Sequence, residues 1–513
     1  RGEGSGQNQW TWQHYNATVG YDGTFGRHVV SASAGILYNI YKTDFSQNGA
    51  AGKMVEYRHM TVNGAVNYAY DDRYVATFSF AADGSDNYRP GNRWGFYPSL
   101  GLGWIVSRER FLRDSRMVDL LKLRASVGKN GWDPMGEMRY LWEGYYTGRG
   151  GLNTGNSEHT WHGGTALSYL PNPDVFAEKS LKYDAGIDLR LWNRLSLNVD
   201  LFLEKRSGIV TQDWMIPGAS GVDNPPYRNI GRMTNKGFEV QLSWADRIGD
   251  FNYALTGMAS YNSNKVDYMA EVVTVPTAAR TGRRLDALFG YVADGFYDWD
   301  DFDVGGELRE GLPKPTFGAV QPGDIKYKNL NGDTVIDEND QTAIGDSYLP
   351  KLQYSFSLAA SYKGFDLFAL FQGAAGRDVN LLDAPLQNVA FRDNGNVYGI
   401  AEGRWAYYPE QGIDTRATAT YPRLSLQDNS NNYRNSTLWK RSGDFLKLRN
   451  VELGYTFAQP SLSKAGISKI RIYLSGVNLL TVSRLMRDYD IDPEILSGHP
   501  ALKSYNLGLT VTF

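Results

Sequence analysis

The chain has 513 residues, a formal net charge of −3 and a mean hydropathy of −0.44. The near balance of charge argues against a nucleic-acid partner, and the absence of any run of 18 apolar residues excludes a bundle of transmembrane helices. Because the chain has no cysteine, disulfides, thiolate metal sites and cysteine nucleophiles are also excluded. Aromatic residues reach 13%, and the girdles at a membrane–water interface use such residues.

Alternation of apolar and polar residues predicts about 15 strands of roughly ten residues, the length that a tilted membrane-spanning strand needs. In the first part of the chain we predict strands at 15–21, 29–41, 60–70, 73–81, 96–106 and 120–128. In the later part we predict them at 183–191, 195–203, 238–244, 253–261, 354–362, 365–371, 445–457, 470–477 and 502–513.

The strand predicted at 195–203 shows the alternation most clearly. Successive side chains of a strand point to opposite faces, so its two faces have different surroundings. The side chains predicted to face lipid are Leu195, Leu197, Val199, Leu201 and Leu203. The side chains predicted to face the barrel lumen are Ser196, Asn198, Asp200 and Glu204.

Short turns such as Trp192–Arg194 and Lys363–Gly364 join some strands, whereas long polar connections separate others. The long connections run over 129–176, 209–231, 265–348 and 376–443. This rhythm is typical of an all-β, transmembrane antiparallel β-barrel with short periplasmic turns and long extracellular loops. An odd number of strands does not close a bacterial barrel, so we expect further strands to precede residue 1.

Two other classes of protein share part of this pattern. A secreted all-β protein that binds or degrades glycans would have the same aromatic residues and the same lack of cysteine. A soluble sandwich, however, does not need successive spans with one wholly apolar face. A passive porin, the second class, would need strands with one wholly apolar face, as a transporter barrel does. No motif in the chain indicates an enzyme, since the nucleophile elbow, the phosphate-binding loop and the His-Glu-x-x-His helix are all missing from the sequence.

One segment, 329–340, has the ligand spacing of an EF-hand-like calcium loop. The oxygen donors that this spacing predicts are Asn329, Asn331, Asp333, the carbonyl of Val335, Asp337 and Asp340. Asn329 carries no charge at the first position, and Thr334 stands where the sharp turn normally has glycine. A structural Ca²⁺ and a plain hydrogen-bonded turn are therefore both open interpretations.

Several blocks of the sequence resemble the SusC/RagA family of TonB-dependent transporters. The segment Gly91–Ser99 is similar to the barrel signature of that family, and Leu121–Gly128 is similar to a neighbouring block. Further similar blocks follow in family order at Pro322–Lys328, Tyr362–Leu367, Leu446–Val451, Ser475–Leu480 and the closing Phe513.

The resemblance implies that residues 1–513 are the C-terminal part of a barrel that has about 22 strands when complete. The plug, the TonB box and an N-terminal extension domain are then expected upstream. It also implies TonB-dependent import of oligosaccharides or peptides across the outer membrane of a Gram-negative bacterium. The implied partners are a SusD-like surface lipoprotein that acts as a lid, the TonB–ExbB–ExbD complex, the N-terminal remainder of the transporter and outer-membrane lipid. A dimer of transporter–lid pairs is implied as well.

Some residues of the long loops and the C-terminus are candidates for contact with cargo, lid or assembly machinery. Aromatic rings in loops stack on sugars and peptide side chains or anchor protein interfaces, although they also pack on one another. The candidates for contact are Trp132, Trp142, Trp161, Trp405, Tyr407 and Tyr408. The resemblance implies that Phe513 is part of the signal read by the barrel-assembly machinery.

Overall fold

The computed structural model describes residues 10–43, 55–133, 139–144, 146–154, 160–167, 169–220, 224–273, 275–384, 388–392, 395–457 and 466–513. Within these residues, fifteen strands form one sheet in the order β1-β2-β3-β4-β5-β6-β9-β10-β11-β12-β19-β20-β25-β26-β27. The chain divides into two compact units. The first comprises residues 1–193, 197–238 and 264–272, and the second comprises residues 194–196, 239–263 and 273–513.

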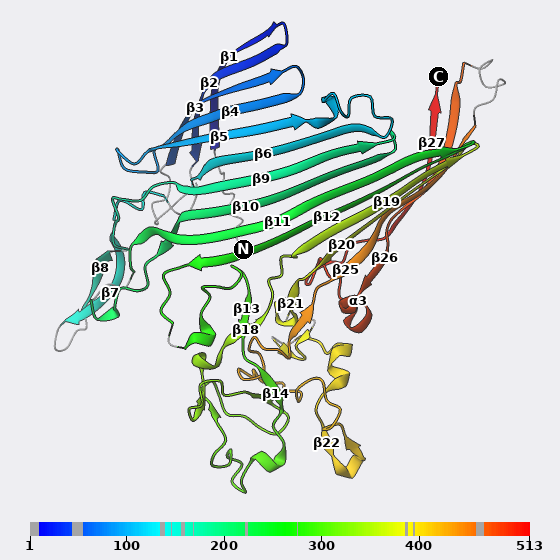
Figure 1. Ribbon diagram of the computed structural model, residues 1–513. Helices are drawn as coiled ribbons and strands as arrows, with labels where there is room; N and C mark the ends of the chain where they lie inside the picture. The colour runs from blue at the N-terminus through cyan, green and yellow to red at the C-terminus, as the bar shows by residue number, and fades with distance from the viewer. Residues whose placement is uncertain are drawn as a thin grey trace. The chain divides into compact units, whose positions relative to one another are not determined.

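The strands β1 to β6 and β9 pair antiparallel in the first unit and lie side by side in Figure 1. Their bounds are β1 Trp10–Phe25, β2 His28–Thr43, β3 Val55–Tyr70, β4 Tyr74–Ser85, β5 Trp94–Ile105, β6 Val118–Trp132 and β9 Glu178–Leu191. β10 (Leu195–Gln212), β11 (Tyr227–Ile248) and β12 (Phe251–Tyr268) have residues in both units.

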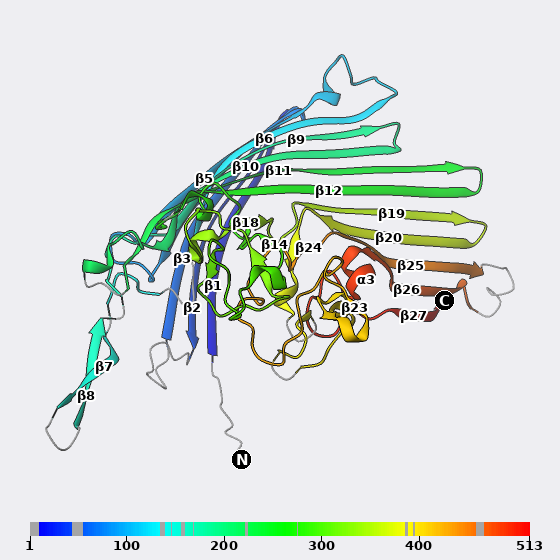
Figure 2. The same ribbon diagram turned by 90° about the horizontal axis from the view of Figure 1, so that it is seen from below.

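In the second unit, antiparallel pairing continues from β12 through β19, β20, β25 and β26 to β27, and Figure 2 shows the last five of these strands as neighbours. Their bounds are β19 Leu352–Tyr362, β20 Phe365–Ala375, β25 Phe445–Phe457, β26 Lys469–Ser483 and β27 Ser504–Thr512. All fifteen predicted strands are confirmed. Several are longer than predicted, and β11 reaches 22 residues. The ladder extends past the apolar band because backbone pairing does not depend on which side chains the strand carries.

Two tight turns show why the strands pair in this register. Lys363 and Gly364 both have positive φ, 47° and 91°, between the paired residues Tyr362 and Phe365. Trp192 and Asn193 also have positive φ, 53° and 49°, between β9 and β10. Positive φ at both central residues is the type I′ geometry, whose twist matches that of the flanking strands.

The two faces of the sheet differ as the alternation predicts. Leu201 of β10 is 57% exposed, whereas its neighbour Asp200 hydrogen-bonds Arg124 on β6. Arg124 also pairs with Asp184 and Asp188 of β9, so these charges share one face. The outward face has no second protein layer in the described residues. It is the face that the barrel presents to lipid.

The long connections contain secondary structure of their own, which the sequence analysis did not predict. In the first unit, β7 (Tyr146–Thr154) and β8 (Thr160–Leu167) form a hairpin. The short strands of the second unit are β13 Leu288–Gly290, β14 Ala293–Phe296, β15 Lys314–Pro315, β16 Ile325–Tyr327, β17 Val335–Ile336, β18 Thr342–Gly345, β21 Asp378–Asn380, β22 Tyr407–Tyr408, β23 Ile413–Asp414 and β24 Lys440–Ser442.

Helices in the described residues are few and short. The α-helix α3 covers Arg484–Tyr489. The 3₁₀ turns are η1 Val106–Arg108, η2 Gly218–Ser220, η3 Pro276–Ala278, η4 Trp299–Asp301, η5 Glu338–Asp340, η6 Leu381–Asp383, η8 Gly399–Gly403 and η9 Pro409–Gln411. None of these helices is both long enough and apolar enough to cross a membrane.

The assignment of faces predicts opposite results for two neighbouring substitutions in β10. We expect Val199→Arg to lower the amount of assembled protein in the outer membrane, because a lipid-facing arginine near mid-membrane costs roughly 2–4 kcal/mol. The matched variant Asn198→Arg places the same side chain on the lumen face and should assemble normally. Heat-modifiable mobility of membrane fractions on gels measures both. Equal assembly of the two variants would contradict the assigned faces.

Candidate functional site: the loop core and its buried ion pair

Three connections of the second unit share one hydrophobic core. Its buried residues come from the β12–β19 connection, the β20–β25 connection and the β26–β27 connection. They are Tyr291, Ile325, Tyr327, Ile336, Val379, Leu381, Ala390, Ala401, Tyr421, Trp439, Leu485 and Ile491. Residues that far apart in sequence pack together only if the three connections fold as one body, which we call the loop core.

A buried carboxylate organises the polar part of the loop core. Asp324 is fully buried and accepts hydrogen bonds from the side-chain amides of Asn429 and Asn432, each at 2.9 Å. Its cationic partner is the guanidinium of Arg423, with Nε 2.7 Å from Oδ1. A buried charge is tolerated only when it is paired and hydrogen-bonded, so these contacts lock the β12–β19 connection to the β20–β25 connection.

Burial also changes the acidity of the tyrosines in this core. Burial raises the pKa of Tyr421 to about 12, and its hydroxyl donates to the carbonyl oxygen of Asn388. Burial likewise raises the pKa of Tyr327, whose hydroxyl donates to the carbonyl oxygen of Asn431. Both tyrosines therefore stay neutral and act as hydrogen-bond donors that hold the loops.

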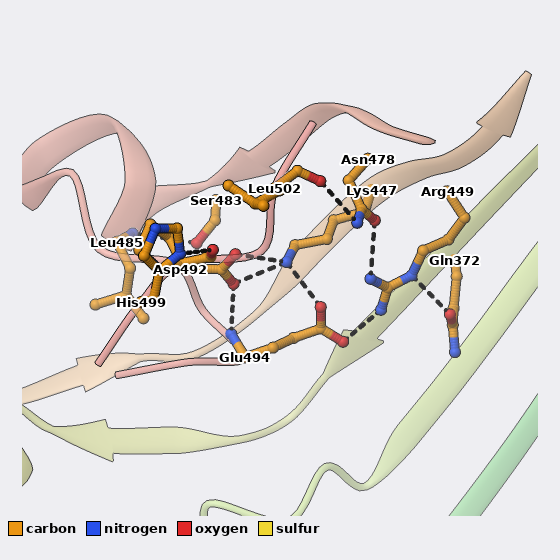
Figure 3. Close-up of polar contacts among 11 residues, drawn as sticks. Gln372, Lys447, Arg449, Asn478, Ser483, Leu485, Asp492, Glu494, His499 and Leu502 are labelled. Carbon is orange, nitrogen blue, oxygen red and sulfur yellow. Dashed lines mark hydrogen bonds and ion pairs between the residues drawn. The ribbon is translucent and has the colours of Figure 1, made fainter. Parts of the chain in front are cut away.

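A second buried charge ties the β26–β27 connection to the sheet (Figure 3). Lys447 of β25 is 1% exposed, and its Nζ lies 2.7 Å and 3.0 Å from the two carboxylate oxygens of Asp492. The same Nζ is 2.7 Å from Glu494. Because Lys447 lies on a strand and both acids lie on the connection, this cluster fixes where the connection sits on β25.

Arg449, two residues after Lys447 on the same face of β25, brings a second cation to one of these acids, Glu494. The pairing of β25 shifts at Arg449 on both sides, which places Arg449 and Asn450 on one face of the strand. Arg449 donates to Glu494, to Gln372 at 2.8 Å and to Asn478 at 3.3 Å, as Figure 3 shows. Burial opposes ionisation of Glu494, yet hydrogen bonds from Arg449 and Lys447 hold the pKa of this carboxyl below its ordinary value.

A cavity of about 600 Å³ lies beside this ion-pair cluster, between η8 and the segment that follows α3. Its lining combines polar and aromatic side chains, among them Tyr398, Glu402, Asp488, Tyr489 and Asp490. Carboxylates accept hydrogen bonds from hydroxyl or amide groups, and tyrosine rings pack on flat apolar faces. The cavity therefore has the chemistry to hold part of a sugar chain or a peptide. The sequence analysis did not find it.

The aromatic candidates lie in different places. Trp405 is only 8% exposed, Tyr407 stacks under the guanidinium of Arg416 at 3.9 Å, and Tyr408 is exposed. In the first unit, Trp132 and Trp161 are exposed, while Trp142 donates from Nε1 to the carbonyl oxygen of Asn87 at 3.1 Å. Contact with a lid or cargo stays a prediction at each position. A substitution of Trp405 would act on lid or cargo binding through the packing of the loops, because its ring is buried.

In the predicted calcium loop, side-chain oxygens and backbone amides bond one another. Asn331 and Asp333 accept from the backbone N–H groups two residues ahead, Asp333 and Val335, at 3.0 and 2.8 Å. The sharp turn falls at Gly332, where φ is 79°, which explains how Thr334 fits at the position that normally has glycine. Within the described residues, no group of three acidic or histidine side chains is gathered for a metal. Calcium binding stays a prediction.

The sequence analysis also predicted roles for Asp340 of the 329–340 loop and for Phe513 at the C-terminus. Asp340 is fully buried, and its carboxylate accepts from the backbone N–H groups of Leu330 at 2.7 Å and Asp337 at 2.9 Å. These two hydrogen bonds close the loop. Phe513 directly follows β27 and is 85% exposed, so its side chain is accessible for the predicted role in assembly.

Comparison with known proteins places the fold in a family. The family described as TonB dependent receptor-like, beta-barrel matches residues 2–479. TonB-dependent receptor P3 of Formosa agariphila is 26% identical over 96% of this chain and 51% of its own length. TonB-dependent receptor SusC of Bacteroides thetaiotaomicron is 26% identical over 88% of this chain and 43% of its own length.

A solved structure of the RagAB peptide transporter has the same fold. It superposes with a TM-score of 0.74 at 21% identity, covering 99% of this chain and 56% of that one. This chain spans about half the length of the curated relatives described above.

The buried ion pair predicts a large effect from removing one charge. We expect Lys447→Met to destabilise the packing of the β26–β27 connection by about 3–5 kcal/mol, because Asp492 is left buried without its cation. Lys351→Met is the matched control, since Lys351 pairs with Asp346 at 2.8 Å but both side chains are about one-third exposed. Limited proteolysis within 484–503 measures the loss. Equal resistance of wild type and Lys447→Met would contradict the role of the ion pair.

The calcium prediction is tested best at Asp333. Because Asn329 and Thr334 depart from the calcium-loop pattern, we expect calorimetry to give a Kd on the order of 10⁻⁴–10⁻³ M. Asp333→Asn should weaken binding at least about tenfold, since a ligand charge is lost. Asp300→Asn, at an exposed acid of the same connection, is the control. Absence of binding heat at millimolar Ca²⁺ would favour the plain hydrogen-bonded turn.

Proposed function

The chain belongs to the family of TonB-dependent receptor-like β-barrels, and from this premise we propose that it is most of the barrel of a SusC/RagA-type importer. The family places the barrel in the outer membrane. The proposed activity is transport without catalysis, with cargo passing through the lumen when the protein is energised by TonB, ExbB and ExbD. An upstream segment of the same protein would supply the plug and the remaining strands.

The observation that carries this proposal is the loop core. A passive pore needs loops that leave its mouth open, and short or separately folded loops are sufficient for that. Here three connections form one hydrophobic core and are fixed to β25 through Lys447 and Asp492. A single ordered body of this kind favours controlled access over free diffusion.

A lid partner of the SusD type is part of the proposal. The described loops of the second unit expose large apolar side chains, among them Trp299, Tyr348, Tyr398, Tyr408 and Leu426. Exposed aromatic side chains of this kind are enriched at protein interfaces. The choice of a SusD-type partner follows from the likeness to SusC, which is 26% identical to this chain over the aligned residues.

The cargo that fits the cavity beside α3 is an oligosaccharide or a peptide. Glu402, Asp488 and Asp490 offer acceptors for hydroxyl or amide donors, and Tyr398 and Tyr489 offer flat faces. A secreted glycan-active protein, the alternative from the sequence, would not need the outward apolar rows of the sheet. The outer-membrane importer accounts for both the lipid face and the cavity.

The partner is tested by purification from native membranes in mild detergent. We expect a SusD-like lipoprotein to copurify, and Tyr408→Ala to weaken that complex by on the order of 2 kcal/mol if Tyr408 is an interface anchor. Tyr183→Ala is the matched control, because Tyr183 is similarly exposed but lies on the lipid face of β9. Trp405→Ala should weaken the complex only through altered packing of the loops, because the Trp405 ring is buried.

The same preparation separates the remaining possibilities. A barrel that carries no lipoprotein at any salt concentration would contradict the lid, while TonB-dependent uptake by cells would still support import. Pairs of transporter–lid complexes in the same preparation would support the expected dimer. Loss of cargo uptake on deletion of the protein, restored by wild type, tests the transport activity itself.

A further inference from the structure

The outward face of β3 to β6 carries an apolar groove. Its volume is about 500 Å³, within the range of roughly 300–1,000 Å³ that is usual for ligand sites. Side chains that line it on this face include Tyr68, Tyr74, Leu102, Trp104 and Leu123. The groove belongs to the lipid-facing side of the barrel, so it is distinct from the cavity beside α3.

Strand register explains why a groove forms at this place. Ala76 of β4, Leu102 of β5 and Ala125 of β6 are direct neighbours in one row across the sheet. The rows on either side are bulkier. One contains Tyr74, Trp104 and Leu123, and the other contains Phe78, Leu100 and Val127. The two alanine methyl groups, one on each side of Leu102, lie lower than the large side chains of the neighbouring rows and form the trough of the groove.

One end of the groove lies at the level of the membrane interface. Tyr74 Oη and Trp104 Nε1 both donate to Glu109, at 2.6 and 3.1 Å, in the turn between β5 and β6. Tyrosine and tryptophan with the polar end directed to a turn are typical of an interfacial girdle. This turn and the short β3–β4 turn close the same end of the sheet, and short turns of a barrel lie on the periplasmic side.

The β5–β6 turn, residues 106–117, is rich in arginine. It contains four arginines against two acidic residues, and its Phe111 is 71% exposed. Arg108 pairs with Asp72, and Arg113 pairs with Asp114. Arg110, next to Glu109 at the rim of the groove, is exposed, and none of the ion pairs within the described residues includes it. Positive charge and an exposed aromatic ring at an interface suit a negatively charged lipid surface.

We propose that this groove and the arginines at its rim bind one anionic phospholipid of the periplasmic leaflet. An acyl chain occupies the trough over Ala76 and Ala125, and the phosphate lies against Arg108 and Arg110. The apolar part is the surface that lipid covers in a membrane, and the charged part selects the headgroup. The site is independent of cargo, lid and TonB, so it goes beyond the proposed import.

A second copy of the chain is a less suitable occupant. A twofold axis along the membrane normal would bring the same face of both barrels together at the same depth. The two arginine-rich turns would then lie side by side, and like charges across an interface oppose association. An anionic headgroup neutralises the same arginines.

Native mass spectrometry of protein purified from outer membranes tests the proposal. Dioleoylphosphatidylglycerol is the anionic probe, and dioleoylphosphatidylethanolamine is the zwitterionic probe. We expect wild type to retain the anionic lipid preferentially, and Arg108→Gln with Arg110→Gln to lower that retention roughly fivefold for each arginine removed. Arg247→Gln is the control, because Arg247 is an exposed arginine at another short turn.

Closing the groove gives a second, separate measurement. Ala76→Phe fills the trough from the lipid side and should reduce retention of both lipids, whereas Leu509→Phe on the outward face of β27 should change neither. Heat-modifiable mobility establishes that each variant has folded. Equal retention of the two lipids by wild type, or unchanged retention by the arginine variant, would overturn the proposal. Loss of a dimer in Ala76→Phe with unchanged lipid retention would overturn it in favour of a second copy.

Discussion

A sheet that faces lipid on one side and a lumen on the other has no second layer to pack against. Its strands are held by backbone hydrogen bonds to their neighbours, because unpaired backbone groups are too costly in hydrocarbon. The outward apolar side chains gain nothing from protein packing there. This constraint explains why the largest hydrophobic core of the described residues lies in the connections and not in the sheet.

The loop core in turn needs an attachment to the sheet, and charges supply it. Lys447 extends from β25 to Asp492 and Glu494, and Arg449 of the same strand adds a second cation to Glu494. A buried ion pair contributes little net stability, since desolvation offsets most of its attraction. The ion pair instead determines where the connection lies, because a shifted connection would leave Lys447 and Asp492 buried without partners. The cluster therefore specifies one placement of the β26–β27 connection beside the cavity.

Sequence patterns predicted the sheet and missed the loop core for the same physical reason. A period of two and a turn such as Lys363–Gly364 are local signals, and they were sufficient to find all fifteen strands. Asp324 and Asn432 are 108 residues apart, so no local pattern marks Asp324 as the centre of a buried network. Trp405 shows the same limit, because no local pattern distinguishes an exposed tryptophan in a long loop from one that long-range packing buries. Neither the ligand spacing nor the packing of segment 329–340 decides whether it binds Ca²⁺, so calcium binding there stays a prediction.

Adjacent residues of β6 carry the two functions that the barrel wall has to combine. Arg124 points to the lumen and pairs with Asp184, Asp188 and Asp200, while Ala125 faces lipid and forms part of the groove. A slip of one residue in the pairing would exchange the two faces, placing a guanidinium in lipid and a methyl group among carboxylates. The inner charges and the outer groove therefore constrain the same register from opposite sides. Within this part of the sheet, the features that could bind lipid also help to fix the pairing that keeps charge inside the barrel.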